Sequence, residues 1–318
     1  MSSSRKLTIL ITGCSPGGTG AALAVTFHAA GHHVYATARN PSKLSSLASQ
    51  GIETLPLDVT SAASIASAVD VVTKSLSEKS TPTDAAVSGR LDMLINNAGG
   101  HYTTPLADAS LDSAKALFDL NVWAQLAVTQ AFLPLLLRSA SSPTSSTASG
   151  PATPMIVNHT SVGSMTPMPF QGLYSASKAA LARLSDSMRQ ELSCLGIRVV
   201  ELKTAGVRTN FIRNSNTNNV EGRALKLPDG SLYEPARELV QGIMSQEQHA
   251  ETGISAEQWA EGVVGDLMRR SPPPVIWRGE NALLARVASV LPAWVFEGVL
   301  KRMMGMDEVE KIMRESRR

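Results

Sequence analysis

Residues 7–30 read LTILITGCSPGGTGAALAVTFHAA, and this stretch decides the fold. The first six residues form an apolar, β-rich run that is typical of a buried parallel strand. The last ten have the composition of a helix, and a glycine-rich segment joins the two. Such glycines permit a tight turn and a close backbone approach, while the helix N-terminus offers N–H groups to a pyrophosphate. We therefore predict a dinucleotide-binding loop here, with a structural turn as the alternative. The residues expected at the cofactor are Gly13, Ser15, Gly18, Thr19 and Gly20.

The end of the second expected strand, residues 33–38, predicts which dinucleotide binds. In a dinucleotide fold this position meets the adenosine ribose, and an acid there would hydrogen-bond the free 2′-hydroxyl of NAD. The chain has Arg39 at this point and no acid, which suits a 2′-phosphate. We therefore predict NADPH, and the alternative is that Arg39 is a surface loop residue.

Strands and helices alternate along the following residues. Further strands are expected at 52–59, 91–99, 155–160 and 197–202, with helices at 61–77, 111–137 and 173–195. This alternation predicts an α/β fold, a Rossmann-type doubly wound parallel sheet with helices on both faces. The polar stretch 78–90 and the Ser/Thr/Pro-rich stretch 139–154 read as loop insertions within one domain.

Tyr174 and Lys178 are four residues apart on one of these expected helices. They therefore share a helix face, where the lysine charge favours ionisation of the tyrosine. Tyr174 is thus a candidate general acid or base, and Ser161, at the end of the preceding strand, is placed to hold a substrate oxygen. Asn121 lies in mid-helix among apolar neighbours, where asparagine is unfavourable by helix propensity. Either a local hydrogen bond in the core or a position facing a site would explain it. The alternative for Tyr174 and Lys178 is that Tyr174 is simply an exposed tyrosine on an ordinary amphipathic helix.

Composition excludes several functional classes. The 318 residues are 43% hydrophobic and 18% charged with a net charge of +2, which favours a globular protein and gives no argument for nucleic-acid binding. Cys14 and Cys194 form neither a disulfide framework nor a metal-ligand spacing, and we expect no metal. We see no signal peptide and no uninterrupted apolar segment of about 20 residues.

Taken together, these motifs resemble the short-chain dehydrogenase/reductase family. The resemblance covers about residues 7–210 and rests on motifs in the family's order: Thr12-Gly13 with Gly18-x-Gly20, Asp58, Asn96-Asn97-Ala98-Gly99, Asn121, Ser161, Tyr174-x-x-x-Lys178 and Gly206-x-x-Thr209.

The resemblance implies a role for each matching residue. Tyr174 would exchange a proton with the substrate oxygen, and Lys178 would lower the Tyr174 pKa and hold the nicotinamide ribose. Ser161 would position the carbonyl, and Asn121 would support a water relay to Lys178. Asp58 would sit at the adenine ring, Asn97 near the ribose, and Val207 and Thr209 at the carboxamide. The remaining expected cofactor contacts are Val59, Ala98, Gly99 and Gly206.

Two departures from the family pattern affect this transfer. The glycine loop is one residue longer than usual, with Pro16 inside it and Thr19 in place of isoleucine. Ala205 replaces the usual proline before Gly206, so we expect a less rigid turn there.

The C-terminal third is expected to contain the substrate side. We place the main domain at 1–274, with 210–274 closing over the substrate, and a helical extension at 275–318 that begins with a strand-like run. Arg213, Arg223 and Lys226 would meet an anionic group or simply be solvated. The pattern at 281–306 suits a helix in a membrane interface, packing on its own domain or on a partner subunit, or a cover over the substrate site. The tail resembles the fungal branch that includes NADPH-dependent 1-acyldihydroxyacetone-phosphate reductases.

From these observations we expect an NADPH-dependent carbonyl reductase that acts on a lipophilic ketone or the corresponding alcohol. Two substrate classes stay open, 1-acyldihydroxyacetone phosphate of lipid synthesis and a polyketide-type ketone of specialised metabolism. A different class of function is a non-catalytic NADP-binding scaffold at a lipid surface. We expect a cytoplasmic homo-oligomer without nucleic-acid partners, and peripheral association with the endoplasmic reticulum or a lipid droplet is an open alternative.

Overall fold

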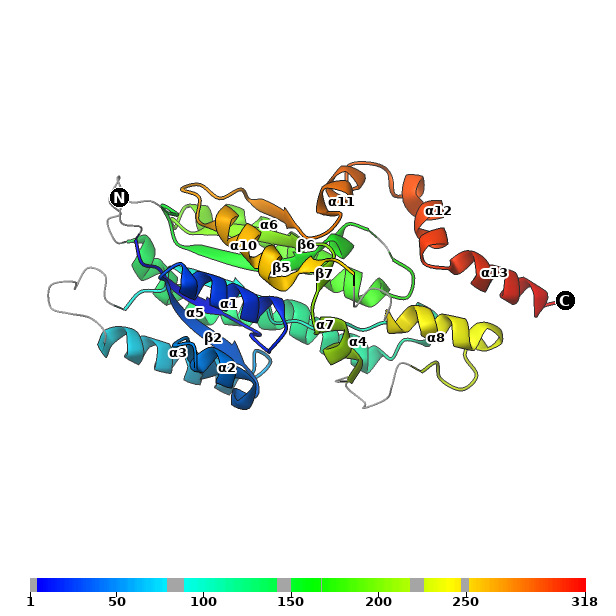
Figure 1. Cartoon of the computed structure of the whole chain (residues 1–318), viewed down its shortest axis with the longest axis horizontal. Coiled ribbons are helices and arrows are strands. Elements are labelled where there is room, and N and C mark those ends of the chain that lie inside the picture. Colours follow the sequence, from blue (N-terminus) through cyan, green and yellow to red (C-terminus); the bar gives the residue numbers. More distant parts are fainter. Residues whose placement is uncertain (1–4, 79–88, 142–149, 167, 218–225, 247–251) are drawn as a thin grey trace.

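A computed structural model describes residues 5–78, 89–141, 150–166, 168–217, 226–246 and 252–318. At its centre is a seven-stranded sheet in the order β3-β2-β1-β4-β5-β6-β9, and every neighbouring pair is parallel (Figure 1). The strands are β1 (Thr8–Ile11), β2 (His33–Ala38), β3 (Glu53–Pro56), β4 (Met93–Asn96), β5 (Met155–Ser161), β6 (Arg198–Thr204) and β9 (Val275–Arg278). The predicted doubly wound parallel sheet is confirmed. Its strand order reverses between β1 and β4, where such sheets hold their ligands beyond the carboxyl ends of the strands.

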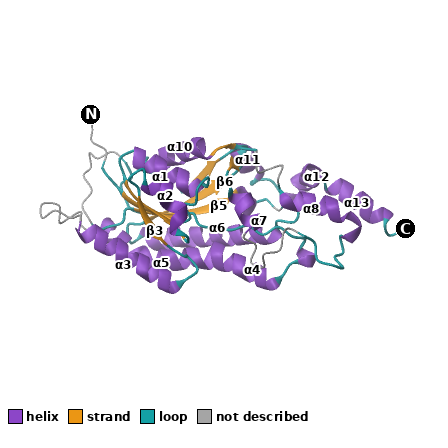
Figure 2. Cartoon of the chain, turned by 60° about the horizontal axis from the view of Figure 1, so that its bottom comes forward, coloured by secondary structure: helices purple, strands orange, loops and turns teal. Residues whose placement is uncertain are grey.

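Helices cover both faces of this sheet (Figure 2). One face carries α1 (Thr19–Ala29), α2 (Ser45–Ala48) and α10 (Ala256–Leu267), whose core includes Phe27 and Trp259. The other carries α3 (Ala62–Glu78), α5 (Ala124–Ala140) and α6 (Gly172–Ser193), whose core includes Phe132 and Met188. Strand residues alternate between the two cores, so both faces of the sheet are apolar, as a buried parallel sheet requires.

The helical run expected at 111–137 is observed as one continuous helix with a defect in it. Helix α4 (Leu111–Phe118) passes through a π-turn (Asp119–Trp123) into α5. By length and composition alone, the whole run Leu111–Ala140 could cross a membrane. We did not expect a segment of this kind from the sequence. Half of the window that passes this test is buried, and α5 packs on the sheet, so its apolar character is that of a core helix.

The expected boundary at residue 274 differs from the observed sheet. Strand β9 pairs with β6 from Glu201↔Val275 onward, so the sheet extends to Arg278. Helix α10 lies in the apolar core with α1, so residues 256–267 are part of the sheet domain and not a cover over a substrate. Residues 79–88 of the stretch 78–90, and residues 142–149 of the stretch 139–154, lie outside the described residues.

Short elements connect the sheet to the C-terminal end. They are α7 (Phe211–Thr217), α8 (Arg237–Ser245), the paired short strands β7 (Val207–Arg208) and β8 (Ile254–Ser255), and then α11 (Ala282–Ala288), α12 (Ala293–Met303) and α13 (Met306–Glu315). The 3-10 turns are Pro41–Leu44, Leu106–Asp108, Val162–Ser164 and Glu234–Ala236.

The C-terminal extension folds back on the region before it. Val309 of α13 is buried in a third apolar cluster with Phe170, Leu227, Val240 and Met244. Leu227 and Met244, which lie in the stretch 210–274 that was expected to close over the substrate, thus form the interior of a cap built from α8 and α13. We call this cluster the cap core.

Candidate active site

The glycine loop between β1 and α1 is tied to the turn after β4 by side-chain hydrogen bonds. Thr12 Oγ1 accepts from the backbone N–H of Asn97 at 3.0 Å and of Ala98 at 2.9 Å. Asn97 Nδ2 donates to the carbonyls of Thr12 and Gly13 at 2.8 and 3.0 Å, and Thr19 Oγ1 lies 2.9 Å from Asn97 Oδ1. Two predicted cofactor segments, far apart in the chain, are therefore one rigid unit.

Glycine is required at several points of this loop by space alone. A Cβ on Gly13, whose φ is +74°, would lie 2.8 Å from the Cα of Ala98. A Cβ on Gly20 would lie 2.5 Å from Asn97 Nδ2 and 2.6 Å from the Gly13 carbonyl oxygen. Helix α1 begins after Gly18 without a side-chain cap, so its first N–H groups are left for another acceptor, as an anion-binding helix end needs.

The extra residue of the loop is used in a contact that the sequence did not predict. Asn210, just after the Gly206–Thr209 turn, donates from its backbone N–H to the Gly17 carbonyl at 3.0 Å and from Nδ2 to the Pro16 carbonyl at 3.3 Å. The lengthened loop therefore reaches the segment that leads into the substrate side.

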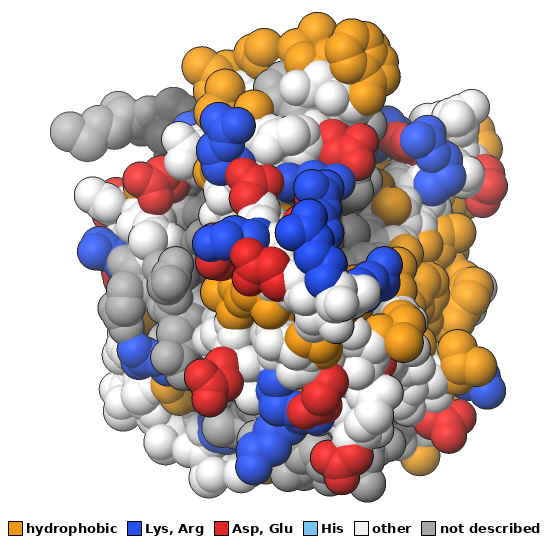
Figure 3. Space-filling view, turned by 90° about the vertical axis from the view of Figure 1, so that its right-hand side faces the viewer, with side chains coloured by type: hydrophobic (Ala, Val, Ile, Leu, Met, Phe, Trp, Pro, Cys, Tyr) orange, Lys and Arg blue, Asp and Glu red, His pale blue; other side chains and the backbone are white. Residues whose placement is uncertain are grey.

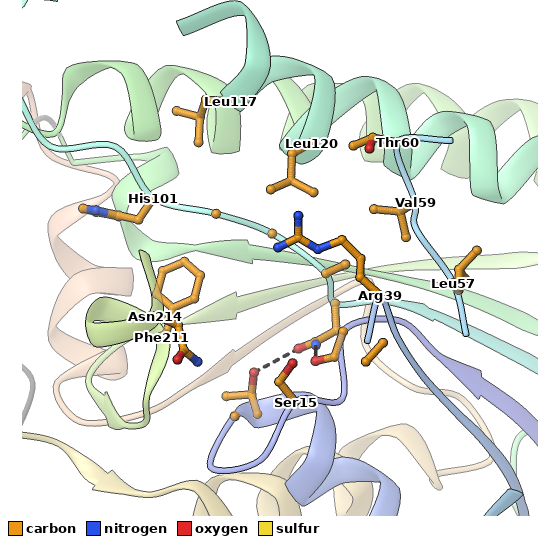
Figure 4. A pocket seen from close by; sticks show the side chains of 18 of the residues that line it. Ser15, Arg39, Leu57, Val59, Thr60, His101, Leu117, Leu120, Phe211 and Asn214 are labelled. Atoms are coloured by element: carbon orange, nitrogen blue, oxygen red, sulfur yellow. Dashed lines mark hydrogen bonds between the residues drawn. The ribbon is translucent and has the colours of Figure 1, made fainter. Parts of the chain in front are cut away.

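A cavity of about 380 Å³ begins at this loop. Its lining combines the glycine loop, the Asn97–Gly99 turn, Arg39 and Val59 with the helix residues Leu117 and Leu120. Figure 4 shows the Arg39 guanidinium extending over the cavity toward Leu120. Lys43 also lines it, and neither cation forms a salt bridge with a described residue. Lys43 was missed because it follows the strand end by four residues, but it stands in the same basic loop as Arg39.

Asp58 is not a lining residue, although its neighbours Val59 and Thr60 are. Its Oδ1 accepts from the Thr60 N–H at 3.0 Å and from Thr60 Oγ1 at 2.7 Å. Burial raises the pKa of Asp58, but the Thr60 hydrogen bonds and the Arg39 charge outweigh it, so the pKa lies below its usual value. The carboxylate thus holds the turn that presents Val59, and its expected contact with adenine stays a prediction.

Tyr174 and Ser161 meet where β5 ends and α6 begins. The phenol hydrogen-bonds the Ser161 hydroxyl, whose oxygen also accepts from the Gly163 N–H at 3.0 Å. Burial raises the pKa of Tyr174, and the bond from Ser161 lowers it by less, so the phenol is neutral near neutral pH. The sequence argument expected a lowered pKa here. The difference arises because desolvation disfavours the phenolate more strongly than the neighbouring groups stabilise it.

Lys178 is held one turn along α6 from Tyr174. Its Nζ donates to the His159 carbonyl at 2.9 Å and lies 5.9 Å from the centre of the Tyr174 ring. Burial lowers the pKa of Lys178 to about 8, so the ammonium is still the main form at pH 7. A buried cation next to the phenol is positioned to stabilise a phenolate after the proton has left.

His159 fixes this lysine and was not singled out from the sequence. Its Nδ1 lies 2.9 Å from Asn97 Oδ1, its Nε2 lies 2.6 Å from Thr204 Oγ1, and its ring stacks on Trp259 at 5.3 Å. Burial, aided by the Lys178 charge, lowers the pKa of His159 to about 3. The neutral ring therefore links three strand ends. The available signal was the polar second half of β5, in which Asn158, His159 and Thr160 follow an apolar run.

Asn121 lies in the π-turn between α4 and α5 and is fully buried. Its Oδ1 accepts from the Gly100 N–H at 2.8 Å, and its Nδ2 donates to the Gly100 carbonyl and to Ser177 Oγ, both at 3.0 Å. Of the two reasons considered, the local hydrogen bond is confirmed, and the place facing a site stays a prediction. The amide clamps the strand-end turn, and Gly99 lies between it and Lys178 Nζ.

The Gly206–Thr209 turn is held without the proline that the family pattern expects. The Ala205 N–H donates to the Arg278 carbonyl at 2.8 Å, a bond that proline could not make. Gly206 pairs with Glu280, and Thr209 Oγ1 accepts from the Phe211 N–H at 3.3 Å at the start of α7. The turn was expected to be less rigid without proline, and its hydrogen bond to Arg278 at the end of β9 holds it instead. Gly206, Val207 and Thr209 do not line the cavity.

The expected anion site near the substrate is only partly described. Arg223 lies outside the described residues, while Arg213 and Lys226 are exposed and do not line the cavity. His101, which does line it, was missed. It follows the Asn96–Gly99 turn directly, and its ring centre lies 4.3 Å from that of Tyr174.

Comparisons with known proteins agree with this geometry. Residues 7–220 match the family model described as short chain dehydrogenase. A short-chain dehydrogenase/reductase from Pestalotiopsis microspora is 45% identical over 311 residues, covering 98% of each chain. An NADPH-dependent 1-acyldihydroxyacetone phosphate reductase from Schizosaccharomyces pombe is 32% identical and is covered over 90% of its length by 91% of this chain. Among solved structures, a short-chain dehydrogenase from Streptomyces avermitilis superposes with a TM-score of 0.69 at 24% identity, covering 97% of this chain and 98% of its own.

Proposed function

The chain belongs to the short-chain dehydrogenase/reductase family, and on that premise we propose that it is an NADPH-dependent carbonyl reductase for a lipophilic ketone. The observation that carries the proposal is the group at the end of α6. A neutral Tyr174 phenol is bonded to Ser161, and a buried Lys178 ammonium lies beside it. These are the protonation states that delivery of a proton to a carbonyl oxygen requires.

The glycine loop and the strand-end cations fit a phosphorylated dinucleotide. Gly13 and Gly20 let the loop pack on the Asn97–Ala98 turn more closely than a Cβ would permit, and the N-terminus of α1 has N–H groups without a side-chain cap for a pyrophosphate. Arg39 and Lys43 line the cavity beyond β2, where a dinucleotide fold is expected to hold the adenosine ribose, and their charges support a 2′-phosphate there. When bound, the cofactor supplies the hydride for the ketone carbon.

The residues of this chain would then handle the oxygen. Ser161 would hold the ketone oxygen, and the Tyr174 phenol would give it a proton as its carbon is reduced. The phenolate left on Tyr174 would be stabilised by the Lys178 ammonium, which the His159 carbonyl keeps in position. Asn121 would keep the Gly100 turn, and with it the wall facing Lys178, in place.

The test is NADPH oxidation with a panel of lipophilic ketones, comparing wild type with Tyr174→Phe. We expect turnover by wild type and a loss of about 100-fold or more in the variant, the usual contribution of a positioned acid. Equal and negligible rates for both would contradict an enzyme and favour the alternative of a non-catalytic NADP-binding scaffold. NADPH binding by both proteins, followed by nicotinamide fluorescence, is the control for folding.

The choice between the two substrate classes needs a direct comparison. Similarity to the Schizosaccharomyces pombe reductase supports an acyl-dihydroxyacetone phosphate, whereas relatives such as one named only as a short-chain dehydrogenase from Talaromyces islandicus, at 35% identity, give no substrate. Turnover of an acyl-dihydroxyacetone phosphate should exceed that of an aromatic polyketide-type ketone if the first class is right. The reverse order would support specialised metabolism.

We also propose that α11 and α12 contact a lipid surface. Four apolar side chains of this region are each more than 70% exposed: Leu283, Val290, Trp294 and Met303. Figure 3 shows hydrophobic side chains gathered along the upper edge of the molecule, and α11 and α12 lie at this height in Figure 1. An exposed tryptophan among aliphatic side chains, with Lys301 and Arg302 on the same helix, suits a membrane interface.

Sedimentation with phospholipid vesicles tests this contact. Wild type should bind vesicles, and Trp294→Ser with Leu283→Ser should not. Concentration-dependent dimerisation that the same changes abolish, without vesicle binding, would instead make this face a subunit interface and support the expected homo-oligomer. Association with the endoplasmic reticulum or a lipid droplet stays a prediction that depends on this result.

A further inference from the structure

A buried polar cluster lies against the catalytic tyrosine, and neither the family motifs nor the proposed mechanism uses it. His101 lies at its centre, with ring centres 4.3 Å from Tyr174 and 6.0 Å from Phe211. Its other neighbours are Thr103 and Gln246, both buried. Because His101 also lines the cavity, its ring is the part of this cluster that forms cavity wall, next to Tyr174.

An acceptor on one side of the ring assigns the tautomer of His101. Gln171 Oε1 lies 3.4 Å from His101 Nε2 and is an acceptor, which places the imidazole proton on Nε2. Gln246 Nε2 donates to Thr103 Oγ1 at 3.1 Å, and in this tautomer the Thr103 hydroxyl donates to His101 Nδ1 at 3.0 Å. Burial, aided by the Lys178 charge and opposed by the Gln171 bond, lowers the pKa of His101 to about 4, so the ring is neutral.

The last link of this network is weak. The Nε2–H of His101 faces Gln171 Oε1 at 3.4 Å, at the long limit for a hydrogen bond. Gln246 Nε2, at 3.5 Å on the same side, is itself a donor and offers no acceptor in this arrangement. The Nε2–H of His101, next to Tyr174, is therefore held by the protein only through one long hydrogen bond.

Backbone strain marks the same place. Phe170 and Gln246 have φ values of +61° and +52°, two of the three non-glycine residues with positive φ in the described chain. Phe170 directly precedes Gln171, so the strained positions set both amides that surround His101. Strained conformations of bulky residues persist where the surroundings enforce them, and they cluster at ligand sites. Phe170 is also part of the cap core, which supplies that enforcement.

We propose that His101 is a substrate-positioning residue that donates a hydrogen bond from Nε2 to a second oxygen of the substrate, next to the reacting carbonyl. The enzyme would thus select ketones that carry a neighbouring oxygen, such as β-keto esters or acyloxy ketones, over dialkyl ketones. The inference rests on the proposed reductase function and specifies its substrate. The Nε2–H of His101 has only the long hydrogen bond to Gln171, so an oxygen of such a substrate would give it a stronger one. A dialkyl ketone has no second oxygen and would leave the hydrogen bond to Gln171 unchanged.

The experiment compares a β-keto ester with the dialkyl ketone of the same chain length in which methylene groups replace the ester. His101→Phe keeps an aromatic ring beside Tyr174 and removes the donor, and His101→Gln returns an amide N–H near the position of Nε2. For His101→Phe we expect kcat/KM for the β-keto ester to fall about tenfold, mostly through KM, with less than about twofold change for the dialkyl ketone. His101→Gln should recover most of the loss.

A second variant tests the direction of the network. Thr103→Val removes the hydroxyl that donates to Nδ1 and leaves a side chain of similar shape. The tautomer is then no longer held, so we expect a smaller loss, about threefold, again confined to the β-keto ester. NADPH binding, measured by fluorescence, should be unchanged in all three variants.

The outcomes separate this inference from the proposed function. Equal losses on both ketones, or no loss on either, would overturn the role of His101 while reduction by wild type left the reductase function standing. Failure of wild type to reduce either ketone, with NADPH bound, would overturn both.

Discussion

The two ends of the cleft are built in different ways. At the cofactor end, backbone and small polar groups bond directly across the sheet, as between Thr12, Asn97 and the glycine loop, and there is no room for an added methyl group at Gly20. At the end that we propose for the substrate, side chains of α8 and α13 pack around Phe170 in the cap core, which is separate from the two sheet cores. A dinucleotide phosphate demands fixed donors at fixed points, whereas a lipophilic ligand demands only a fitted apolar wall. We therefore expect substitutions at the cofactor end to change the Kd for NADPH, and substitutions at the substrate end to change the KM for the ketone.

The largest effect is expected for Gly20→Val. Its Cβ would fall 2.5 Å from Asn97 Nδ2 and 2.6 Å from the Gly13 carbonyl oxygen, so the loop must shift. We expect the Kd for NADPH to rise by about 100-fold, equivalent to about 2.7 kcal/mol. Titration of nicotinamide fluorescence measures it.

Gly242→Ala is the matched control at the other end. This glycine is inside α8, and a Cβ there meets nothing within 4 Å. The change should leave NADPH binding unaltered and raise the free energy of unfolding by up to about 1 kcal/mol, because alanine loses less backbone entropy in a helix. Weaker cofactor binding in this control would show that the two ends are coupled and break the comparison.

A pH dependence is expected at the junction of the two ends. Reduction needs the neutral Tyr174 phenol and the Lys178 ammonium, and the pKa of Lys178 is about 8 while that of Tyr174 is raised by burial. The charge on Lys178 is present below pH 8 and lost above it, so kcat for ketone reduction should fall about tenfold between pH 7 and pH 9. The measurement is kcat at saturating NADPH and ketone, and a rate that rises over this range would contradict the assigned protonation states.

A smaller and opposite pattern is expected for Val309→Asp in α13. Val309 is 1% exposed in the cap core, and burying a carboxylate there should loosen α13 from α8. We expect KM for the ketone to rise about fivefold, equivalent to about 1 kcal/mol, with the Kd for NADPH unchanged. Asp307→Asn, at an exposed position of the same helix, should change neither quantity. A rise in the Kd for NADPH without a change in the KM for the ketone would contradict this prediction and assign α13 to the cofactor end.

The smallest effect is expected for Asn210→Ala, which removes the Nδ2 bond to the Pro16 carbonyl and leaves the backbone bond to Gly17. Because this side chain bridges the two ends, the Kd for NADPH and the KM for the ketone should each rise about twofold to threefold, as for one exposed hydrogen bond. Paired titrations of cofactor and ketone measure both. A change in only one of them would assign Asn210 to that end.

The sequence predicted the cofactor end better than the substrate end for a physical reason. Glycine spacing, a strand-end arginine and the Tyr174–Lys178 pair depend on local backbone geometry, and each lies at a strand end that a parallel sheet must bring together. Asp58 shows the limit of this reasoning, because its carboxylate is held by Thr60 two residues away. At the substrate end, His101 is set by Gln171 and Gln246, which are 70 and 145 residues away, and no local pattern relates them.

The doubly wound sheet and the helices on both of its faces follow from the sequence alone, because periodicity and glycine spacing act within a few residues. The same local patterns singled out Ser161, Tyr174 and Lys178 as candidates. Only the tertiary structure decided that β9 completes the sheet, that Asn121 sits in a π-turn and that α13 seals the cap core. It also decided the neutral state of Tyr174, since burial depends on every element packed around the phenol and spacing along the chain carries no measure of it.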